Sequence, residues 1–281
     1  MKKYALITPS FNPDFERCRL LCESVDRFVD PTVQHYIIVD RRDYQLFKTL
    51  RNRRTSLICV EDIIPYWIFR IPLINKLWLS LKTLPLRNWI LQQLVKLTAP
   101  AILTEENFLY TDSDVFFVRP YLPKSMEQNG AIPLFMETGQ RGLIQKNDLW
   151  HASAATLLGC STDPSYDTNF IDNVIPWRRA NVILLQEHLS NRYACDWQQV
   201  IARQLSLSEY VLYGLFCTRI LGEQSLHFPD PVKRSHSYWE SVPMGATALL
   251  KFKNDLGPEH TSVMISAKSH TDVSLIRQAF L

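Results

Sequence analysis

Two aspartates one residue apart, Asp112 and Asp114, are the side chains of this sequence whose type and spacing most clearly suggest chemistry. They follow the apolar run from Asn107 to Tyr110, which is typical of a buried strand reaching its end. Side chains at positions i and i+2 of an extended chain project to the same side, and apolar flanks make unpaired charge costly. The pair therefore predicts a site for a hard divalent cation, Mg²⁺ or Mn²⁺, which takes one or two carboxylates and leaves positions for phosphate oxygens.

The alternative for this acidic pair is a turn in which the aspartates cap backbone N–H groups. The apolar residues from Val115 to Val118 favour a continuing strand, and hence the metal. An apolar strand ending in Asp-x-Asp is also the first strand of the fold in phosphatases that use an aspartyl nucleophile. Three predicted strands precede the pair in this chain, which argues against that arrangement.

A further carboxylate that could do chemistry is Glu209, in the apolar segment from Ser206 to Ile220. Burial in an apolar helix disfavours the charged form of a carboxylate and would suit it to accept a proton as a general base. The alternative is structural, because Ser206-x-x-Glu209 is a capping box in which the glutamate reaches back to the serine N–H. Both interpretations stay open.

The first sixty residues alternate between strand and helix patterns that would position these side chains. Short apolar runs predict strands at 4–8, 35–40 and 55–60, and three- and four-residue spacing predicts helices at 14–28 and 43–54. This order is typical of a parallel sheet with right-handed crossovers, so we expect an α/β fold with a Rossmann-like layer. Such sheets bind ligands at the carboxyl ends of their strands.

The rest of the chain is less regular. The apolar pattern predicts helices at 87–97, 151–158, 176–191 and 206–220, and a strand at 130–137. No linker long enough to mark a boundary is visible. We therefore expect a single domain over 1–281.

Composition narrows the classes of function. Of the 281 residues, 46% are hydrophobic, which is ample for one core and argues against disorder. A formal charge of +3 is far from the basic excess of a dedicated nucleic-acid binder. The six cysteines include no C-x-x-C pair, so neither a zinc site nor a disulfide framework is expected.

The N-terminal apolar run is shorter than that of a secretory signal, so we expect a cytoplasmic protein. The most apolar region, from Ile63 to Leu103, is broken by prolines and basic residues and is not expected to cross a membrane. Its interleaved cations and Trp67, Trp78 and Trp89 could instead sit at the inner membrane surface, as a peripheral contact. The alternative is that these segments cover a core.

Three stretches of the sequence resemble a known family. They are Leu6-Ile-Thr-Pro-Ser10 followed by Asp14, Trp89-x-x-x-Gln93-x-x-Lys96-Leu97 before Tyr110-Thr-Asp-Ser-Asp114, and Ser208-Glu-Tyr-x-x-Tyr-Gly214. With the Asp-x-Asp pair they resemble nucleotide-sugar glycosyltransferases of the GT-A type, and among these a bacterial family assigned as glycosyltransferases and otherwise of unknown function. The resemblance implies a Rossmann-like GT-A fold, with a mixed, mostly parallel central sheet flanked by helices.

The resemblance implies a nucleotide-binding half at 1–120 and an acceptor-binding half at 121–281, with the nucleotide site at the strand ends. Its residues would be the loop after the first strand and carboxylates nearby: Thr8, Pro9, Ser10, Asp14, Asp40 and Asp112. Asp40 would accept a hydrogen bond from the ribose or the base. The alternatives are an ordinary turn for the loop, and for Asp40 a helix cap or a partner for Arg41 or Arg42.

On the helix before the acidic pair, Trp89, Gln93 and Lys96 are spaced i, i+4 and i+7 and share one face. Gln93 and Lys96 would bind the nucleotide, with Lys96 neutralising the diphosphate, unless Lys96 is a solvated surface lysine. His236 resembles the late histidine that completes the metal shell in many GT-A enzymes, and the alternative is a surface histidine in a polar loop. Four aromatic or imidazole rings would offer flat faces to an acceptor sugar: Trp150, His151, Tyr166 and Trp177. The alternative is that these rings belong to the core.

The function implied is a glycosyltransferase dependent on Mn²⁺ or Mg²⁺ that moves a sugar from a nucleoside-diphosphate donor to a carbohydrate or lipid-linked acceptor. Glu209 would deprotonate the acceptor if the reaction inverts the anomeric centre, and would only position substrate if it retains. The rival functions are a phosphatase with Asp112 as nucleophile and a non-catalytic carbohydrate-binding protein on a transferase-like fold.

Overall fold

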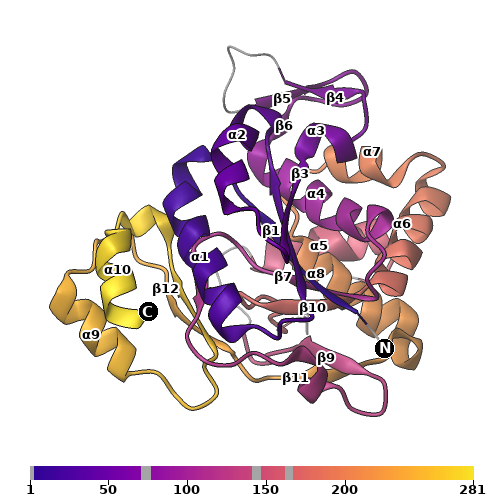
Figure 1. Ribbon diagram of the computed structural model, residues 1–281. Helices are drawn as coiled ribbons and strands as arrows, with labels where there is room; N and C mark the ends of the chain where they lie inside the picture. The colour runs from indigo at the N-terminus through magenta and orange to yellow at the C-terminus, as the bar shows by residue number, and fades with distance from the viewer. Residues whose placement is uncertain (1–2, 71–76, 141–146, 162–166) are drawn as a thin grey trace.

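The computed structural model describes residues 3–70, 77–140, 147–161 and 167–281. At its centre is a five-stranded sheet in the order β10–β7–β1–β2–β3 (Figure 1). Four strands are parallel, and β10 runs antiparallel to β7. The expected α/β fold with a mixed, mostly parallel central sheet is confirmed. The strands are β1 (Tyr4–Pro9), β2 (Gln34–Val39), β3 (Thr55–Cys59), β7 (Asn107–Tyr110) and β10 (Ile175–Arg178).

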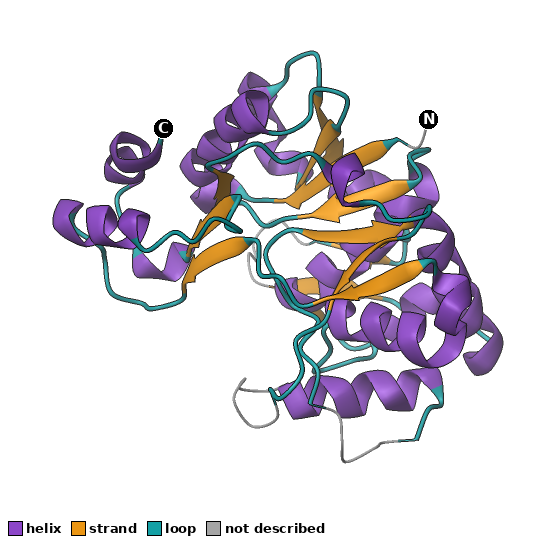
Figure 2. Cartoon of the chain, turned by 90° about the horizontal axis from the view of Figure 1, so that it is seen from below, coloured by secondary structure: helices purple, strands orange, loops and turns teal. Residues whose placement is uncertain are grey.

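The inner strands β1 and β7 are buried on both faces, which explains their mostly apolar sequences. Side chains alternate between the two faces of a strand. Ile7 and Phe108 therefore pack with α4 (Asn88–Ile102) and α6 (Arg179–Tyr193) in the largest core cluster, whereas Leu6 and Leu109 pack with α1 (Phe15–Phe28) on the other face. Figure 2 shows helices on both sides of the central strands.

Helices α1 and α2 lie on the face that Leu6 occupies, and α4 to α8 contribute to the core on the opposite face. The helices of this layered part are α1 (Phe15–Phe28), α2 (Tyr44–Phe47), α3 (Val60–Ile63), α4 (Asn88–Ile102), α5 (Asn147–Leu158), α6 (Arg179–Tyr193), α7 (Trp197–Ala202) and α8 (Glu209–Leu215).

Three smaller sheets surround the central one. A sheet in the order β12–β13–β8 packs against α9 and α10, at the left of Figure 1, while β9 pairs with β11 and the antiparallel sheet β4–β5–β6 stands at the top. Their elements are β4 (Ile68–Phe69), β5 (Leu77–Ser80), β6 (Leu86–Arg87), β8 (Val115–Phe117), β9 (Ile132–Phe135), β11 (His227–Asp230), β12 (Ser235–Tyr238), β13 (Ser262–Ile265), α9 (Ala246–Asn254) and α10 (Val273–Phe280).

Two predicted elements are wrong in a way that matters for the site. The stretch from Asn107 to Val118 is not one strand, because β7 belongs to the central sheet and β8 pairs with β13. Between them the chain turns, and the Val115 N–H donates to the Asp112 carbonyl at 3.2 Å. The strand β10 lies partly inside the predicted helix 176–191, since pairing with β7 outweighs the local helical pattern.

The Trp-rich segment after Ile63 covers a core for the most part. Trp67 and Trp78 are buried, so they do not face a membrane as one interpretation proposed. Trp89 is 48% exposed, but its indole N–H donates to the Leu207 carbonyl at 3.0 Å. No helix in the described ranges has the length and apolarity that a bilayer span requires.

Candidate active site

The carboxyl ends of β1, β2 and β7 lie at one edge of the central sheet, because these strands are parallel neighbours. An acidic residue follows each of them: Asp14 after β1, Asp40 after β2 and Asp112 after β7. The segments after β1 and β7 are in contact, since the Ser113 hydroxyl donates to Asp14 Oδ2 at 3.3 Å. Carboxylates therefore gather where parallel sheets bind ligands.

Lys96 of α4 lies at the centre of this edge and is almost fully buried. Its Nζ is 3.1 Å from Asp112 Oδ1 and 3.0 Å from Glu209 Oε1, and it donates to the Tyr210 hydroxyl at 2.8 Å. Its charge is thus balanced by two carboxylates, and a hydroxyl accepts one of its hydrogen bonds. Lys96 is therefore neither a surface lysine nor available to a diphosphate, and it ties Asp112 to α8.

The electrostatic environment keeps Lys96 charged. Burial on its own would lower the pKa of Lys96, but the negative charge of Asp112 and its other oxygen partners raise that pKa well above its usual value. The two carboxylates differ in their surroundings, because the Glu209 side chain is 5% exposed and that of Asp112 is 50% exposed. Asp112 thus keeps one side towards solvent while Lys96 holds the other.

Asp114 is fixed by a different part of the chain. Its Oδ2 accepts a hydrogen bond of 3.0 Å from the backbone N–H of Ala267, in the loop after β13. Burial and repulsion from Asp112 raise the pKa of Asp114 to about 6, although the Ala267 N–H and Arg17 oppose the shift. Burial also raises the pKa of Asp14, and Asp112 adds to it. Three carboxylates therefore repel one another at this edge.

A divalent cation would relieve this repulsion, and carboxylate oxygens are ligands that Mg²⁺ and Mn²⁺ prefer. Asp112 and Asp114 therefore fit such an ion as two of its ligands. Within the described ranges, no three His, Cys, Asp or Glu side chains are placed to hold a metal ion together. Phosphate oxygens and water would have to complete the shell.

His236 does not lie with the two aspartates. It is in β12, where its ring stacks on Phe252 with 4.1 Å between centroids and lies 5.0 Å from the ring of His260. The strand β13 separates β12 from β8, which follows Asp114. The prediction that His236 completes a metal shell is therefore corrected, and so is its alternative place in a polar loop.

Of the three neighbouring residues proposed at the end of β1, one has a polar side chain to offer a ligand. Thr8 is fully buried, and its hydroxyl lies 3.0 Å from His35 Nε2, so it is committed to the core. Pro9 ends the strand, and the Ser10 N–H donates to the Ile38 carbonyl at 2.9 Å. The Ser10 hydroxyl is buried without a hydrogen-bond partner among the described residues. Ser10 is therefore the better candidate for contact with a nucleotide.

Asp40 forms ion pairs with two arginines. Its Oδ2 is 2.7 Å from Arg70 and 3.3 Å from Arg42. Burial raises the pKa of Asp40, and these guanidinium groups oppose the shift. Arg41 pairs with Asp62 instead. The ion-pair alternative therefore holds for Arg42 but not for Arg41. A ribose hydroxyl would have to compete with Arg70 for the Asp40 carboxylate.

The helix face predicted on α4 is displaced by one position. Gln92 Nε2 donates to Asp112 Oδ1 at 3.3 Å, whereas Gln93 is buried and both of its amide atoms lack a partner within the described part of the chain. Gln92 and Lys96 are i, i+4 neighbours, which is why both reach Asp112. That spacing is the signal in the sequence that could have identified Gln92.

Two of the rings proposed for an acceptor sugar belong to the core. Trp177 is fully buried and stacks on Tyr213 with 4.4 Å between ring centroids. His151 is buried with its Nε2 2.7 Å from the Thr168 carbonyl oxygen, and burial lowers its pKa. Neither ring can present a face to a sugar.

The other two proposed rings have different outcomes. Trp150 is partly exposed and stacks on Trp89, with 6.0 Å between centroids and 15° between planes. Because Trp89 is on α4, three positions before Gln92, this stack lies near the acidic edge. Tyr166 lies outside the described residues.

The capping-box alternative for Glu209 does not hold. The helix α8 begins at Glu209 itself, and its N-cap is Ser208, whose hydroxyl accepts from the Val211 N–H at 3.5 Å. Ser206 lies two positions too early to cap this helix. The Glu209 carboxylate turns to Lys96 instead, so it is an ion-paired member of the acidic edge.

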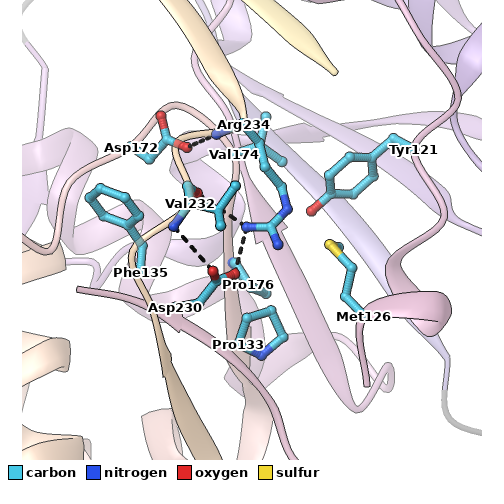
Figure 3. A pocket seen from close by; sticks show the side chains of 10 residues that line it. All are labelled: Tyr121, Met126, Pro133, Phe135, Asp172, Val174, Pro176, Asp230, Val232 and Arg234. Carbon is cyan, nitrogen blue, oxygen red and sulfur yellow. Dashed lines mark hydrogen bonds and ion pairs between the residues drawn. The ribbon is translucent and has the colours of Figure 1, made fainter. Parts of the chain in front are cut away.

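A second charged cluster lines a small cavity beside β9 and β10 (Figure 3). Arg234 pairs with Asp230 at 2.6 Å, and the Arg234 backbone N–H donates to Asp172 Oδ2 at 3.0 Å. The Tyr121 hydroxyl is buried there without a partner among the described residues. The cavity has a volume of about 10 Å³, room for about one water molecule. We regard it as a structural cluster and not as a substrate site.

Asp172 should make stability depend on pH. Burial raises its pKa to about 6 from an ordinary value of 3.8, against the opposing charge of Arg234. As pH rises through this window, the unfolded chain loses the proton before the folded protein does, so stability falls. Asp172→Asn cannot ionise, and its advantage over wild type should grow by on the order of 1–3 kcal/mol from pH 4 to pH 8. Urea unfolding at both pH values measures this, and an unchanged difference would contradict the raised pKa.

Comparisons with known proteins give one family and a distant structural likeness. No curated protein matches the sequence. Among solved structures, galactosyltransferase LgtC in complex with donor and acceptor sugar analogs is similar at 12% identity, with a TM-score of 0.48, over 93% of this chain and 86% of that chain. An active-site mutant of LgtC is similar at 10% identity, with a TM-score of 0.47 and the same coverage.

The family match spans nearly the whole sequence. It extends over residues 6–279, and therefore includes the central sheet, the acidic edge and the carboxyl-terminal helices. This chain belongs to the family of unknown function DUF6492.

Proposed function

We propose that this protein is a metal-dependent glycosyltransferase that moves a sugar from a nucleoside-diphosphate donor to a carbohydrate or lipid-linked acceptor. The observation that most supports this is the group of Asp14, Asp112 and Asp114 at the carboxyl edge of the sheet. Their mutual repulsion favours a bound cation. A cation held there, at the edge where α/β sheets bind nucleotides, suits the charge of a diphosphate.

In this proposal Asp112 and Asp114 would hold Mn²⁺ or Mg²⁺, which supplies Lewis-acid stabilisation of the departing diphosphate when bound. The protein's own part is to fix the geometry. Lys96 holds one oxygen of Asp112, and the Ala267 N–H holds one oxygen of Asp114. Restraining both carboxylates before substrate arrives lowers the cost of ordering them at the moment of reaction. Ser10 would contact the nucleotide through its hydroxyl.

Two further residues have proposed roles towards the acceptor. Trp150, supported from behind by Trp89, would offer a flat surface for a sugar ring. Glu209 would accept the proton of the acceptor hydroxyl if the reaction inverts the anomeric centre. In a retaining reaction Glu209 would instead act through Lys96, as a residue that keeps Asp112 in place.

Nucleotide binding should depend on a divalent cation. Calorimetry with UDP, GDP, CDP and ADP should show, for one of them, an affinity at least about tenfold higher in Mn²⁺ than in EDTA, because the ion would join the carboxylates to the diphosphate. A matched control is Asp255→Asn, an exposed aspartate in the loop after α9. That variant should bind as wild type does.

Each other outcome of this experiment contradicts a different part of the proposal. Equal affinity in Mn²⁺ and EDTA would contradict the proposed metal dependence. Binding of none of the diphosphates would contradict the proposed transferase activity. A beryllium fluoride adduct that Asp112→Asn abolishes would replace it with the aspartyl phosphatase.

A further inference from the structure

Four large apolar side chains are exposed around the small sheet at the top of Figure 1. Leu81, Leu84 and Leu205 are each more than 70% exposed, and Tyr66 is 87% exposed. We call these four residues the leucine patch. Leu84 and Leu205 line one surface groove of about 180 Å³, although they are far apart in sequence. Tyr66 and Leu81 are neighbours of each other, because the Leu81 N–H donates to the carbonyl of Trp67, the residue after Tyr66, at 3.0 Å.

Two arginines lie beside the leucine patch. The other Lys and Arg residues from Ile63 to Thr104 do not contribute, because Arg70, Lys82 and Lys96 are ion-paired with carboxylates and Lys76 lies outside the described residues. Arg87 and Arg203 line the same groove as the leucines, are exposed, and make no ion pair with a described carboxylate. Exposed leucines beside the two guanidinium groups of Arg87 and Arg203 match the surface of an anionic bilayer, where the apolar side chains enter the headgroup layer and the cations meet lipid phosphate.

The leucine patch is connected directly to the acidic edge. Arg87 is the last residue of β6, and α4 begins at the next position. Gln92, which contacts Asp112, follows five positions later, roughly 8 Å along the helix axis. On the other side, Leu205 precedes Leu207, whose carbonyl accepts the indole N–H of Trp89. A surface that holds the leucine patch would therefore lie beside the proposed site.

We propose that the leucine patch docks this protein on an anionic lipid bilayer, with its leucines in the headgroup layer and Arg87 and Arg203 on lipid phosphates. The side chains responsible differ from the tryptophans that the sequence suggested, because Trp67 and Trp78 are buried. Docking there would present a lipid-linked acceptor to the acidic edge. Only that last step rests on the proposed function, since bilayer binding itself needs neither donor nor metal.

Sedimentation with vesicles tests the docking. The full chain, without nucleotide or metal, should bind vesicles of phosphatidylcholine with 40% phosphatidylglycerol at low ionic strength, and at least about fivefold less to pure phosphatidylcholine. In the double variant Leu84→Ser/Leu205→Ser the bound fraction should fall at least about fivefold. In Arg87→Glu/Arg203→Glu the bound fraction on the anionic vesicles should fall by a similar factor. Because these side chains are exposed, the thermal midpoints of both variants should match wild type.

The matched control is Leu250→Ser, which removes a leucine of 56% exposure from α9, at the lower left of Figure 1 and away from the small sheet at the top. It should bind vesicles as wild type does. Loss of binding in this control, or full binding by the Leu84→Ser/Leu205→Ser variant, would overturn the assignment of the surface. A dimer in light scattering that this double variant dissociates, without vesicle binding by wild type, would assign the leucine patch to self-association instead. Failed vesicle binding with intact nucleotide binding would leave the proposed function standing.

Discussion

Replacement of Lys96 by methionine should lower the free energy of unfolding by about 3–5 kcal/mol, the usual cost of removing one partner from a buried ion pair. The Glu209 carboxylate would remain buried at 5% exposure without its cation, and the Tyr210 hydroxyl would lose its donor. Asp112 would contribute less, because it is half-exposed and water can solvate its charge. Urea unfolding at pH 7.5 measures the loss.

The double variant Lys96→Met/Glu209→Gln serves as the matched control. It removes the buried negative charge together with its partner, so it should recover part of the stability that Lys96→Met loses. Glu209→Gln alone should cost less than Lys96→Met, since its amide oxygen can still accept from Lys96. A Lys96→Met protein as stable as wild type would show that Lys96 does not join the helices over this edge.

Asp114→Asn should abolish the dependence of nucleotide binding on Mn²⁺. Loss of a direct ligand should cost at least the roughly 100-fold found at the upper end for outer-shell changes around metals. The fold should survive, because the asparagine oxygen can still accept from the Ala267 N–H. Calorimetry in Mn²⁺ and in EDTA should therefore give equal, weak affinities for the variant.

A thermal melt separates this effect from misfolding. Since burial raises the pKa of Asp114, removing its charge should leave the melting temperature at pH 7.5 equal to or above that of wild type. Retention of the Mn²⁺ effect by a folded Asp114→Asn protein would move the metal away from the acidic pair. A lower melting temperature with no binding would point to a structural role for the carboxylate.

Most strands of the central sheet were predictable because neighbouring residues in the sequence determine them. β1, β2 and β3 each coincide with a short apolar run, and α1 follows the spacing of the predicted helix 14–28. The strand β10 was not predictable in this way, because Ile175–Arg178 becomes a strand by pairing with β7, far away in sequence. Likewise, the break between β7 and β8 depends on β13, which gives the second strand its partner.

The candidate site was likewise predictable only where neighbouring residues determine it. Asp112 and Asp114 could be placed at a strand end from neighbouring residues alone. Their surroundings could not, because Glu209 reaches Asp112 only through Lys96, and Ala267 approaches Asp114 from a distant segment. The burial of Thr8, Trp177 and Lys96 was also beyond the sequence, since each could equally have faced a ligand. Gln92 is the exception, for its i, i+4 relation to Lys96 is visible in the sequence.

The two aspartates are anchored in different layers of the molecule. Asp112 is held by α4 and α8 over the central sheet, whereas Asp114 is held by the loop after β13, in the layer with α9 and α10. An ion that binds both would therefore act as a cross-link between two parts of the fold. The stability it contributes would extend to the carboxyl-terminal helices.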